Sequence, residues 1–150
     1  MRFSIKGEYG ILAALEIALH SDQGPIQVRK IAVQQGIPVR FLEQVMSSLK
    51  KSGLVESVRG AQGGYRLTKP ADEIRLSDLI QAVEGPIAPM VRHTENGFDS
   101  RRNQGEDGVL KEVWEEVKAS ILGVLDSISL QDLCNRKKAL EEKKALMYHI

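Results

Sequence analysis

The first third of the chain repeats its apolar residues at the spacing of an α-helix in three stretches, at residues 7–20, 27–35 and 38–51. A segment with glycine and proline separates the first two stretches, as expected for a loop. Gly36 suits the end of the second helix, where a left-handed backbone is common, and Pro38 suits the first turn of the third. Two short helices joined by so tight a turn predict a helix-turn-helix.

A short β-hairpin is predicted directly after the third helix. Two stretches that mix apolar with polar residues, Leu54 to Val58 and Tyr65 to Thr68, flank a tip that contains three glycines. A helix-turn-helix followed at once by a hairpin is a winged helix. A fourth apolar stretch at residues 76–84 predicts one more helix. We therefore expect residues 1–84 to form a winged helix-turn-helix domain that binds DNA.

The second half of the chain has a different pattern. Residues 85–108 are rich in glycine, proline and charged side chains and show no regular period, so we expect a loop. From residue 109 the pattern becomes strongly helical, with apolar residues alternately four and three positions apart. This seam, too apolar for a lone exposed helix, consists of Leu110, Trp114, Val117, Ile121, Val124 and Ile128.

The seam predicts a dimerisation helix, which would pair with the same helix of a second copy. Ser129 can cap a further short helix, so we expect the dimerisation helix and this short helix to occupy residues 109–135. The charge-dense tail at residues 136–150 is expected to fray. The expected fold class is mainly α: a winged helix-turn-helix domain with a β-hairpin wing plus a long C-terminal dimerisation helix.

The net charge of +1 hides an uneven distribution. Residues 1–70 contain ten Lys and Arg against five Asp and Glu, whereas residues 71–150 contain eleven against fifteen. A basic first half can attract phosphates, which agrees with a DNA-binding domain there. The longest apolar stretch, Ile11 to Leu19, is too short to span a bilayer, and no secretory signal pattern is present. We therefore expect a cytoplasmic protein with no membrane partner.

The third predicted helix carries side chains that can read DNA. Opposite its apolar face it presents Arg40, Glu43, Gln44, Ser47, Ser48 and Lys51, and Lys50 precedes the last of these. Arg can bridge O6 and N7 of guanine, Gln can pair with adenine, and Glu can accept from N4 of cytosine. The first residues of a recognition helix usually face bases, which favours Arg40, Glu43 and Gln44, whereas the two lysines suit phosphates. An ordinary solvated face is the alternative, and the adjoining turn and hairpin argue against it.

The tip of the hairpin is the second candidate contact with DNA. Gly60, Gly63 and Gly64 permit positive φ and a close approach of the backbone. Arg59, at the start of this narrow projection, suits the minor groove, whose potential is most negative in A-tracts. The alternative is a turn that needs glycine for its geometry alone.

Seven segments, in the right order, resemble the Rrf2 family of bacterial transcription regulators. They are Met1 to Tyr9, Ile31 to Ile37, Phe41 to Gln44, Leu49 to Val55, Ser57 to Gly60, Gly63 to Leu67 and Ala82 to Gly85. The resemblance extends from Met1 to about Asp132 and implies a homodimer with an N-terminal winged helix and a long dimerisation helix. Residues of the matching segments complete our set of expected DNA contacts: Arg2, Lys6, Phe41 and Tyr65.

The sequence departs from the cluster-binding members of this family. Those members carry three cysteines in the loop before the long helix, whereas residues 85–108 of this chain contain none. Thiolates are the usual ligands of iron–sulfur clusters, and the single cysteine, Cys134, follows the long helix. We therefore expect no cofactor and, in particular, no iron–sulfur cluster.

The sensor-type loop, residues 85–108, holds other polar groups instead: His93, Glu95, Asp99, Glu106 and Asp107. His93 is either a solvated histidine or a ligand for a metal or small anion. Cys134 is either a plain helix residue or a redox switch, and for both residues the plain interpretation is favoured. An effector of unknown identity, a small molecule or a metal, is a further expected partner.

We expect a sequence-specific transcriptional regulator, either a repressor or a dual regulator, that binds a two-fold related operator in double-stranded DNA as a homodimer. An enzyme is not expected, because no glycine-rich phosphate loop and no Ser/His/Asp or Cys/His set is recognisable. A winged helix used for protein contacts is the alternative function. The basic residues Arg40, Lys50, Lys51 and Arg59 argue against it, and a test with duplex DNA would separate the two.

Overall fold

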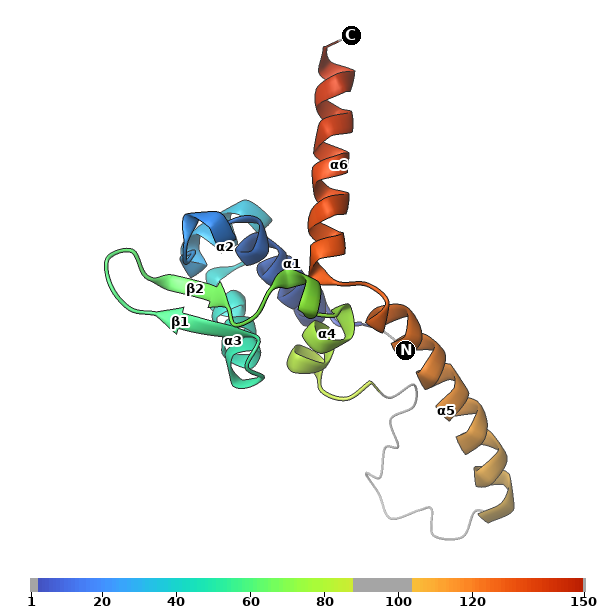
Figure 1. The fold of residues 1–150 in the computed structure, drawn as a ribbon. Helices are drawn as coiled ribbons and strands as arrows, with labels where there is room; N and C mark the ends of the chain where they lie inside the picture. The colour runs from blue at the N-terminus through green and yellow to red at the C-terminus, as the bar shows by residue number, and fades with distance from the viewer. Residues whose placement is uncertain (1–2, 88–103, 150) are drawn as a thin grey trace.

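The computed structural model describes residues 3–87 and 104–149 of the 150-residue chain, with side chains described from residue 108 in the second stretch. In chain order, its helices and strands (Figure 1) are α1 Ile5–Leu19, α2 Val28–Gln35, α3 Val39–Lys51, β1 Val55–Val58, β2 Gly64–Leu67, α4 Leu76–Glu84, α5 Gln104–Asp126 and α6 Leu130–Tyr148. Single 3₁₀ turns lie at Ser21–Gln23 and Ala71–Glu73. The mainly α winged-helix architecture expected from the sequence is confirmed.

The helix-turn-helix is formed by α2 and α3, each starting within one residue of its predicted position. Gly36 between them has a φ of 63°, the left-handed conformation that glycine adopts without strain. The N–H of Ile37 donates to the carbonyl of Ala32 over 3.0 Å, which closes the end of α2. The turn therefore has the geometry that the glycine predicted.

The wing is an antiparallel hairpin of β1 and β2, in which Val55 pairs with Leu67 and Val58 with Gly64. A third segment supports it, because Ile26, in the link before α2, exchanges two backbone hydrogen bonds with Tyr65, at 3.0 and 2.8 Å. A β-carbon at Gly64 would lie 2.3 Å from the carbonyl oxygen of Ile26. Glycine is therefore required where the wing joins the domain.

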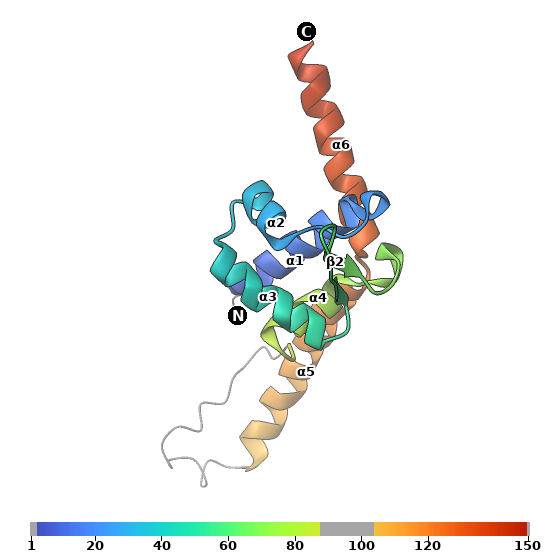
Figure 2. The same cartoon turned by 90° about the vertical axis from the view of Figure 1, so that its left-hand side faces the viewer.

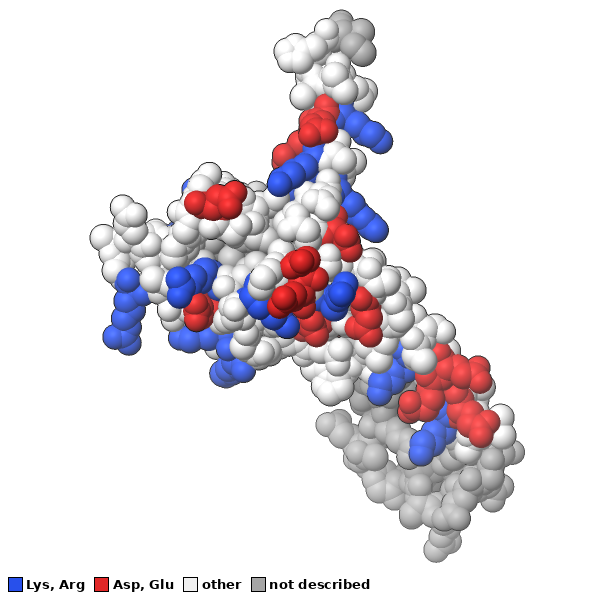
Figure 3. All heavy atoms as spheres, in the orientation of Figure 1, with Lys and Arg blue, Asp and Glu red and all other residues white. Residues whose placement is uncertain are grey.

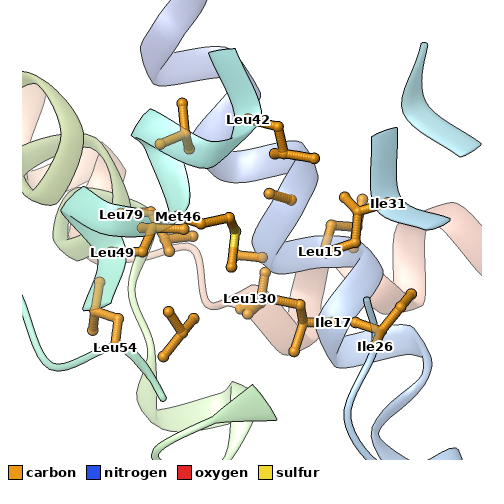
Figure 4. Packing of buried hydrophobic residues seen from close by; sticks show 14 of the residues in the cluster. Leu15, Ile17, Ile26, Ile31, Leu42, Met46, Leu49, Leu54, Leu79 and Leu130 are labelled. Atoms are coloured by element: carbon orange, nitrogen blue, oxygen red, sulfur yellow. The ribbon is translucent and has the colours of Figure 1, made fainter. Parts of the chain in front are cut away.

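The main core lies around α1, whose Ala13 and Ala14 are fully buried and let neighbouring helices approach closely. Figure 4 shows aliphatic side chains that converge on it from several elements, among them Met46 of α3, Leu79 of α4 and Leu130 of α6. Each such buried side chain contributes about 1.5–3 kcal/mol relative to exposure. The start of α6 therefore belongs to the core of the N-terminal domain, although it lies far along the chain.

The helices α5 and α6 leave the N-terminal domain in opposite directions (Figures 1 and 2). Their junction is tied to the start of α4, because the N–H of Leu76 donates to Ile128 over 2.9 Å and that of Leu130 to Ile74 over 2.8 Å. A small second cluster of Ile80, Ile87 and Leu125 packs α4 against α5. None of the helices in the described ranges is long and apolar enough to cross a membrane.

Two boundaries predicted for the C-terminal half were wrong. The long helix begins at Gln104, inside the expected loop, and the expected fraying tail is helix as far as Tyr148. Ser129 and Asp132 form a capping box at the start of α6, as the sequence indicated. The residues after it are mostly Ala, Leu, Lys and Glu, which have high helix propensity, so dense charge does not prevent the helix from continuing. Of the loop expected at residues 85–108, residues 88–103 lie outside the described residues.

Candidate DNA-binding interface

The helix α3 has one fully buried face and one polar exposed face. Leu42, Val45, Met46 and Leu49 are all 0% exposed, because they pack into the main core. Five of the six polar residues predicted for the opposite face are exposed, and the sixth, Ser48, is half-buried; the five are Arg40, Glu43, Gln44, Ser47 and Lys51. Packing therefore fixes the rotation of α3, and with it the set of side chains that can reach a DNA groove.

A shallow hollow on this face is lined by residues of both α1 and α3. It is lined by Lys6, Arg40, Glu43, Gln44, Ser47, Ser48 and Lys51. Lys6 comes from the first turn of α1, so the fold places it beside α3. Arg2, the other N-terminal residue predicted to contact DNA, lies outside the described residues. The hollow combines cationic groups with hydrogen-bonding groups, the mixture that phosphates and base edges require.

The two lysines at the end of α3 have different surroundings. The Nζ atom of Lys50 donates to Oγ of Ser57 on β1 over 3.0 Å, so this side chain lies against the wing. Lys51 lines the hollow instead. The sequence suggested one role for both, whereas the structure places only Lys51 beside Arg40 and Gln44.

Phe41 lies on the first turn of α3 and is 55% exposed. An aromatic side chain there is costly to leave in water, and apolar contact with the methyl group of thymine is a known use of such a residue. Its contact with DNA stays a prediction, and its exposure is compatible with one.

The glycines of the wing differ in their surroundings. Gly60, with a φ of 120°, has open space around it, and Arg59 beside it is exposed. Gly63 is buried, and a β-carbon there would lie 2.2 Å from the carbonyl oxygen of Val58. Gly63 and Gly64 are therefore required by the geometry of the hairpin itself, which was the alternative to a contact with DNA. The partly buried ring of Tyr65 packs against the main core.

Three exposed basic residues of the helix-turn-helix and the wing were not among the contacts predicted from the sequence. Arg66 is exposed on β2, where its Nε lies 2.5 Å from Oε1 of Glu56 on β1. Arg29 and Lys30 are exposed on α2. The alternation along β2, which turns Tyr65 inward and Arg66 outward, could have identified the first of these. Figure 3 shows Lys and Arg gathered around the wing in this view, and a group of Asp and Glu along α5.

The thiol of Cys134 is 3% exposed within the main core, and this burial raises its pKa. A buried, protonated thiol is a poor metal ligand and a poor redox group. In the portion of the chain that the structure covers, no three His, Cys, Asp or Glu side chains are grouped so as to hold a metal. The other candidate ligands, His93 to Asp99 and the side chains of Glu106 and Asp107, lie outside that portion. The described residues therefore offer no donor set for an iron–sulfur cluster.

The predicted dimerisation seam on α5 is divided between two environments. Leu110 and Val124 are 52% and 61% exposed. Ile121 instead packs against the cluster of Ile80 and Leu125, within the same chain. The seam residue that packs within the chain lies at the end of α5, where this helix contacts α4. The exposed part of the seam is the part available to another molecule.

Comparisons with known proteins agree with this architecture. A family model named Rrf2 and described as an iron-dependent transcriptional regulator matches residues 3–136. The HTH-type transcriptional regulator IscR of Photorhabdus laumondii is 38% identical over 148 residues, which cover 94% of this chain and 84% of that protein. The HTH-type transcriptional regulator CymR of Bacillus subtilis is 34% identical over 150 residues, which cover both chains completely.

Two solved structures have the same fold. The structure of CymR, described as the global cysteine regulator of B. subtilis, superposes with a TM-score of 0.75 at 34% identity, over 91% of this chain and 98% of that one. The structure of IscR from T. potens superposes with a TM-score of 0.71 at 39% identity, over 91% and 88%. The chain belongs to the Rrf2 family and is a winged-helix transcriptional regulator that binds DNA.

Proposed function

We propose that the chain acts as a homodimer on a two-fold related operator, with α3 of each protomer in a major groove. The observation that carries this proposal is the polar face of α3 with Lys6 beside it, held outward by a fully buried opposite face. A symmetric dimer presents two such helices, so its operator is expected to contain two related half-sites.

Within each half-site we assign base reading to the start of α3 and phosphate contact to the groups around it. Arg40, Glu43 and Gln44 are exposed on the first two turns, where recognition helices usually meet base edges. Lys51 and Lys6 line the same hollow as cationic groups suited to phosphates. Arg59 at the wing tip suits the adjacent minor groove.

The test is selection of bound duplexes from a random-sequence pool, followed by affinity measurements at several salt concentrations. Glu43→Gln is expected to change the selected bases, whereas Glu141→Gln, the same substitution on an exposed position of α6, is expected to leave them unchanged. Lys51→Met is expected to weaken binding to all sequences alike and to reduce the salt dependence by about one phosphate contact. Equal loss of sequence preference in Glu43→Gln and Lys51→Met would contradict these roles.

The homodimer is supported by the apolar residues that α5 and α6 leave exposed. Those on α5 include Leu110 and Val124, and those on α6 include Leu140, Leu146 and Met147. Patches of this kind on a folded protein mark interaction sites. Sedimentation of the purified protein as a monomer at micromolar concentration would contradict the proposal.

We further propose that DNA binding by this chain does not depend on a resident iron–sulfur cluster. Such clusters need several thiolates, and the one thiol here lies in the core with a raised pKa. DNA affinity is therefore expected to survive aerobic purification and treatment with chelators. Stoichiometric iron and sulfide in anaerobically purified protein, lost in Cys134→Ala, would contradict this.

A further inference from the structure

A buried carboxylate lies between the helix-turn-helix and the C-terminal helix. Glu16, near the end of α1, is only 3% exposed, and glutamate is rarely buried without partners. Its Oε1 accepts from Nε2 of Gln35 at 2.5 Å and from Nζ of Lys137 at 3.2 Å. Its Oε2 lies 3.4 Å from Nδ1 of His20, one turn later on α1. One carboxylate thus joins side chains of α1, α2 and α6.

The places of its partners connect this group to the geometry of DNA binding. Gln35 is the last residue of α2 and directly precedes the turn that leads into α3. Lys137 lies on α6, 121 positions from Glu16 along the chain. The other contacts of α6 with this core include the apolar side chains of Leu130 and Cys134 and, at its first residue, the backbone hydrogen bond from Leu130 to Ile74. Apolar contacts are non-directional, whereas a charge-assisted hydrogen bond fixes both distance and direction.

We propose that Glu16 is a positioning residue that, through Lys137 and Gln35, sets the separation of the two half-sites that the dimer accepts. The inference rests on the homodimer proposed above, because α5 and α6 then connect the two DNA-binding domains. A small rotation of the domain on α6 moves α3 along the DNA, where successive base pairs are only about 3.4 Å apart. Loss of the contacts that Glu16 makes with Lys137 and Gln35 lets the dimer accept a wider range of half-site spacings. The bases preferred within each half-site do not change.

The experiment compares Lys137→Met with Lys138→Met in the full-length dimer. Both substitutions remove one positive charge from α6, but Lys138 is exposed, whereas Lys137 holds the buried carboxylate. Bound duplexes are selected from a random-sequence pool, and affinity is then measured for operators whose half-site spacing is one base pair longer or shorter. Wild type and Lys138→Met are expected to prefer one spacing. Lys137→Met is expected to discriminate among spacings about tenfold less, with unchanged half-site bases.

Three further variants sharpen the result. Gln35→Ala is expected to relax the spacing in the same way, whereas Gln34→Ala, its exposed neighbour, is expected to have no effect. Lys137→Arg keeps the charge and is expected to restore the wild-type preference. Rescue by a conservative change separates positioning from general loss of stability.

Three results for Lys137→Met would overturn the proposal: wild-type discrimination among spacings, equal weakening at every spacing, or loss of the dimer or of the fold. A positioning role leaves the dimer and the fold intact, which thermal unfolding and sedimentation measure. If the wild-type pool contains no paired half-sites, the homodimeric operator fails together with this inference. If paired half-sites are present and only the variant results disagree, this inference alone fails.

Discussion

The N-terminal domain and the C-terminal helix pair bury their apolar residues to very different degrees. On α3, the inward-facing side chains are completely buried. On α5 and α6, large apolar side chains are exposed at Val109, Leu110, Val113, Val124, Leu140, Leu146, Met147 and Tyr148. The domain therefore completes its core within one chain, whereas the helix pair carries surface suited to a further partner.

The two regions are nevertheless packed against each other where they meet. Leu130 and Cys134, at the start of α6, lie in the same core cluster as Leu42 and Leu79. The hydroxyl of Ser77 on α4 also donates to the carboxylate of Asp126 at the end of α5. An isolated fragment of residues 1–84 would lack these contacts. The folding unit thus differs from the segment that carries the DNA-binding motif.

The largest effect on stability is expected from truncating a buried side chain of the N-terminal domain. Leu42→Ala is expected to lower the free energy of unfolding by about 2–5 kcal/mol, because it opens a cavity in a fully packed core. Val33→Ala truncates an aliphatic side chain that is 82% exposed on α2, outside the proposed dimer surface, and is expected to cost less than about 0.5 kcal/mol. Urea unfolding monitored by circular dichroism measures both. Similar losses in the two variants would show that the burial of Leu42 does not decide its contribution to stability.

The next largest effect is expected on dimerisation, from a substitution at an exposed apolar residue of α5. Val124→Asp is expected to weaken dimerisation on the order of a hundredfold, because it places an unpaired charge in an apolar interface. Val124 is a better probe than Ile121, which packs within its own chain. Ala119→Asp adds the same charge at an exposed position on another face of α5 and serves as the control. Analytical ultracentrifugation over a concentration series gives the constants, and an unchanged constant for Val124→Asp would place the interface elsewhere.

A smaller effect concerns backbone geometry in the two regions. Gly64→Ala is expected to destabilise the domain by about 1–3 kcal/mol, because the new β-carbon meets the backbone of Ile26 and the residue has a φ of 152°. Gly123→Ala, in α5, has open space and is expected to stabilise the helix by up to about 1 kcal/mol. Thermal unfolding measures both. A tolerated Gly64→Ala would mean that the wing can shift away from Ile26.

The smallest expected effect depends on pH and lies at the start of α6. The N–H of Ser129 donates to the carboxylate of Asp132, and this bond holds the pKa of that carboxyl below its ordinary value of 3.8. The stabilisation is therefore present above pH 3.8 and is lost as the pH falls toward the lowered pKa.

Asp132→Asn is expected to reduce the pH dependence of unfolding in this acid range. Asp72→Asn, at an exposed position of a 3₁₀ turn, is the control for removal of one carboxylate. Unfolding free energies measured between pH 5 and pH 3 would show the difference. The same pH dependence in wild type and Asp132→Asn would mean that the cap does not contribute to stability.

Much of the fold and of the candidate interface could be predicted from local patterns. The helical period of Leu42, Val45, Met46 and Leu49 determined which face of α3 turns inward, and therefore which residues can meet DNA. The glycine at position 36 indicated the turn because few other residues adopt a left-handed backbone without strain. The extent of α6 was not predicted, because dense charge was weighted above the helix propensity of its residues.

What the sequence determined by itself were the features that depend on neighbours along the chain: helix faces, the turn, the wing and its arginine. Only the tertiary structure decided which distant groups meet. It brought Lys6 beside α3, pressed Gly64 against Ile26, and joined Glu16 to Lys137. The physical reason is that periodicity and propensity act over a few residues, whereas the pairing of buried groups depends on how whole helices pack. The sequence shows a glutamate on an otherwise apolar helix face, but its hydrogen-bond partners on other helices can be identified only in the folded structure.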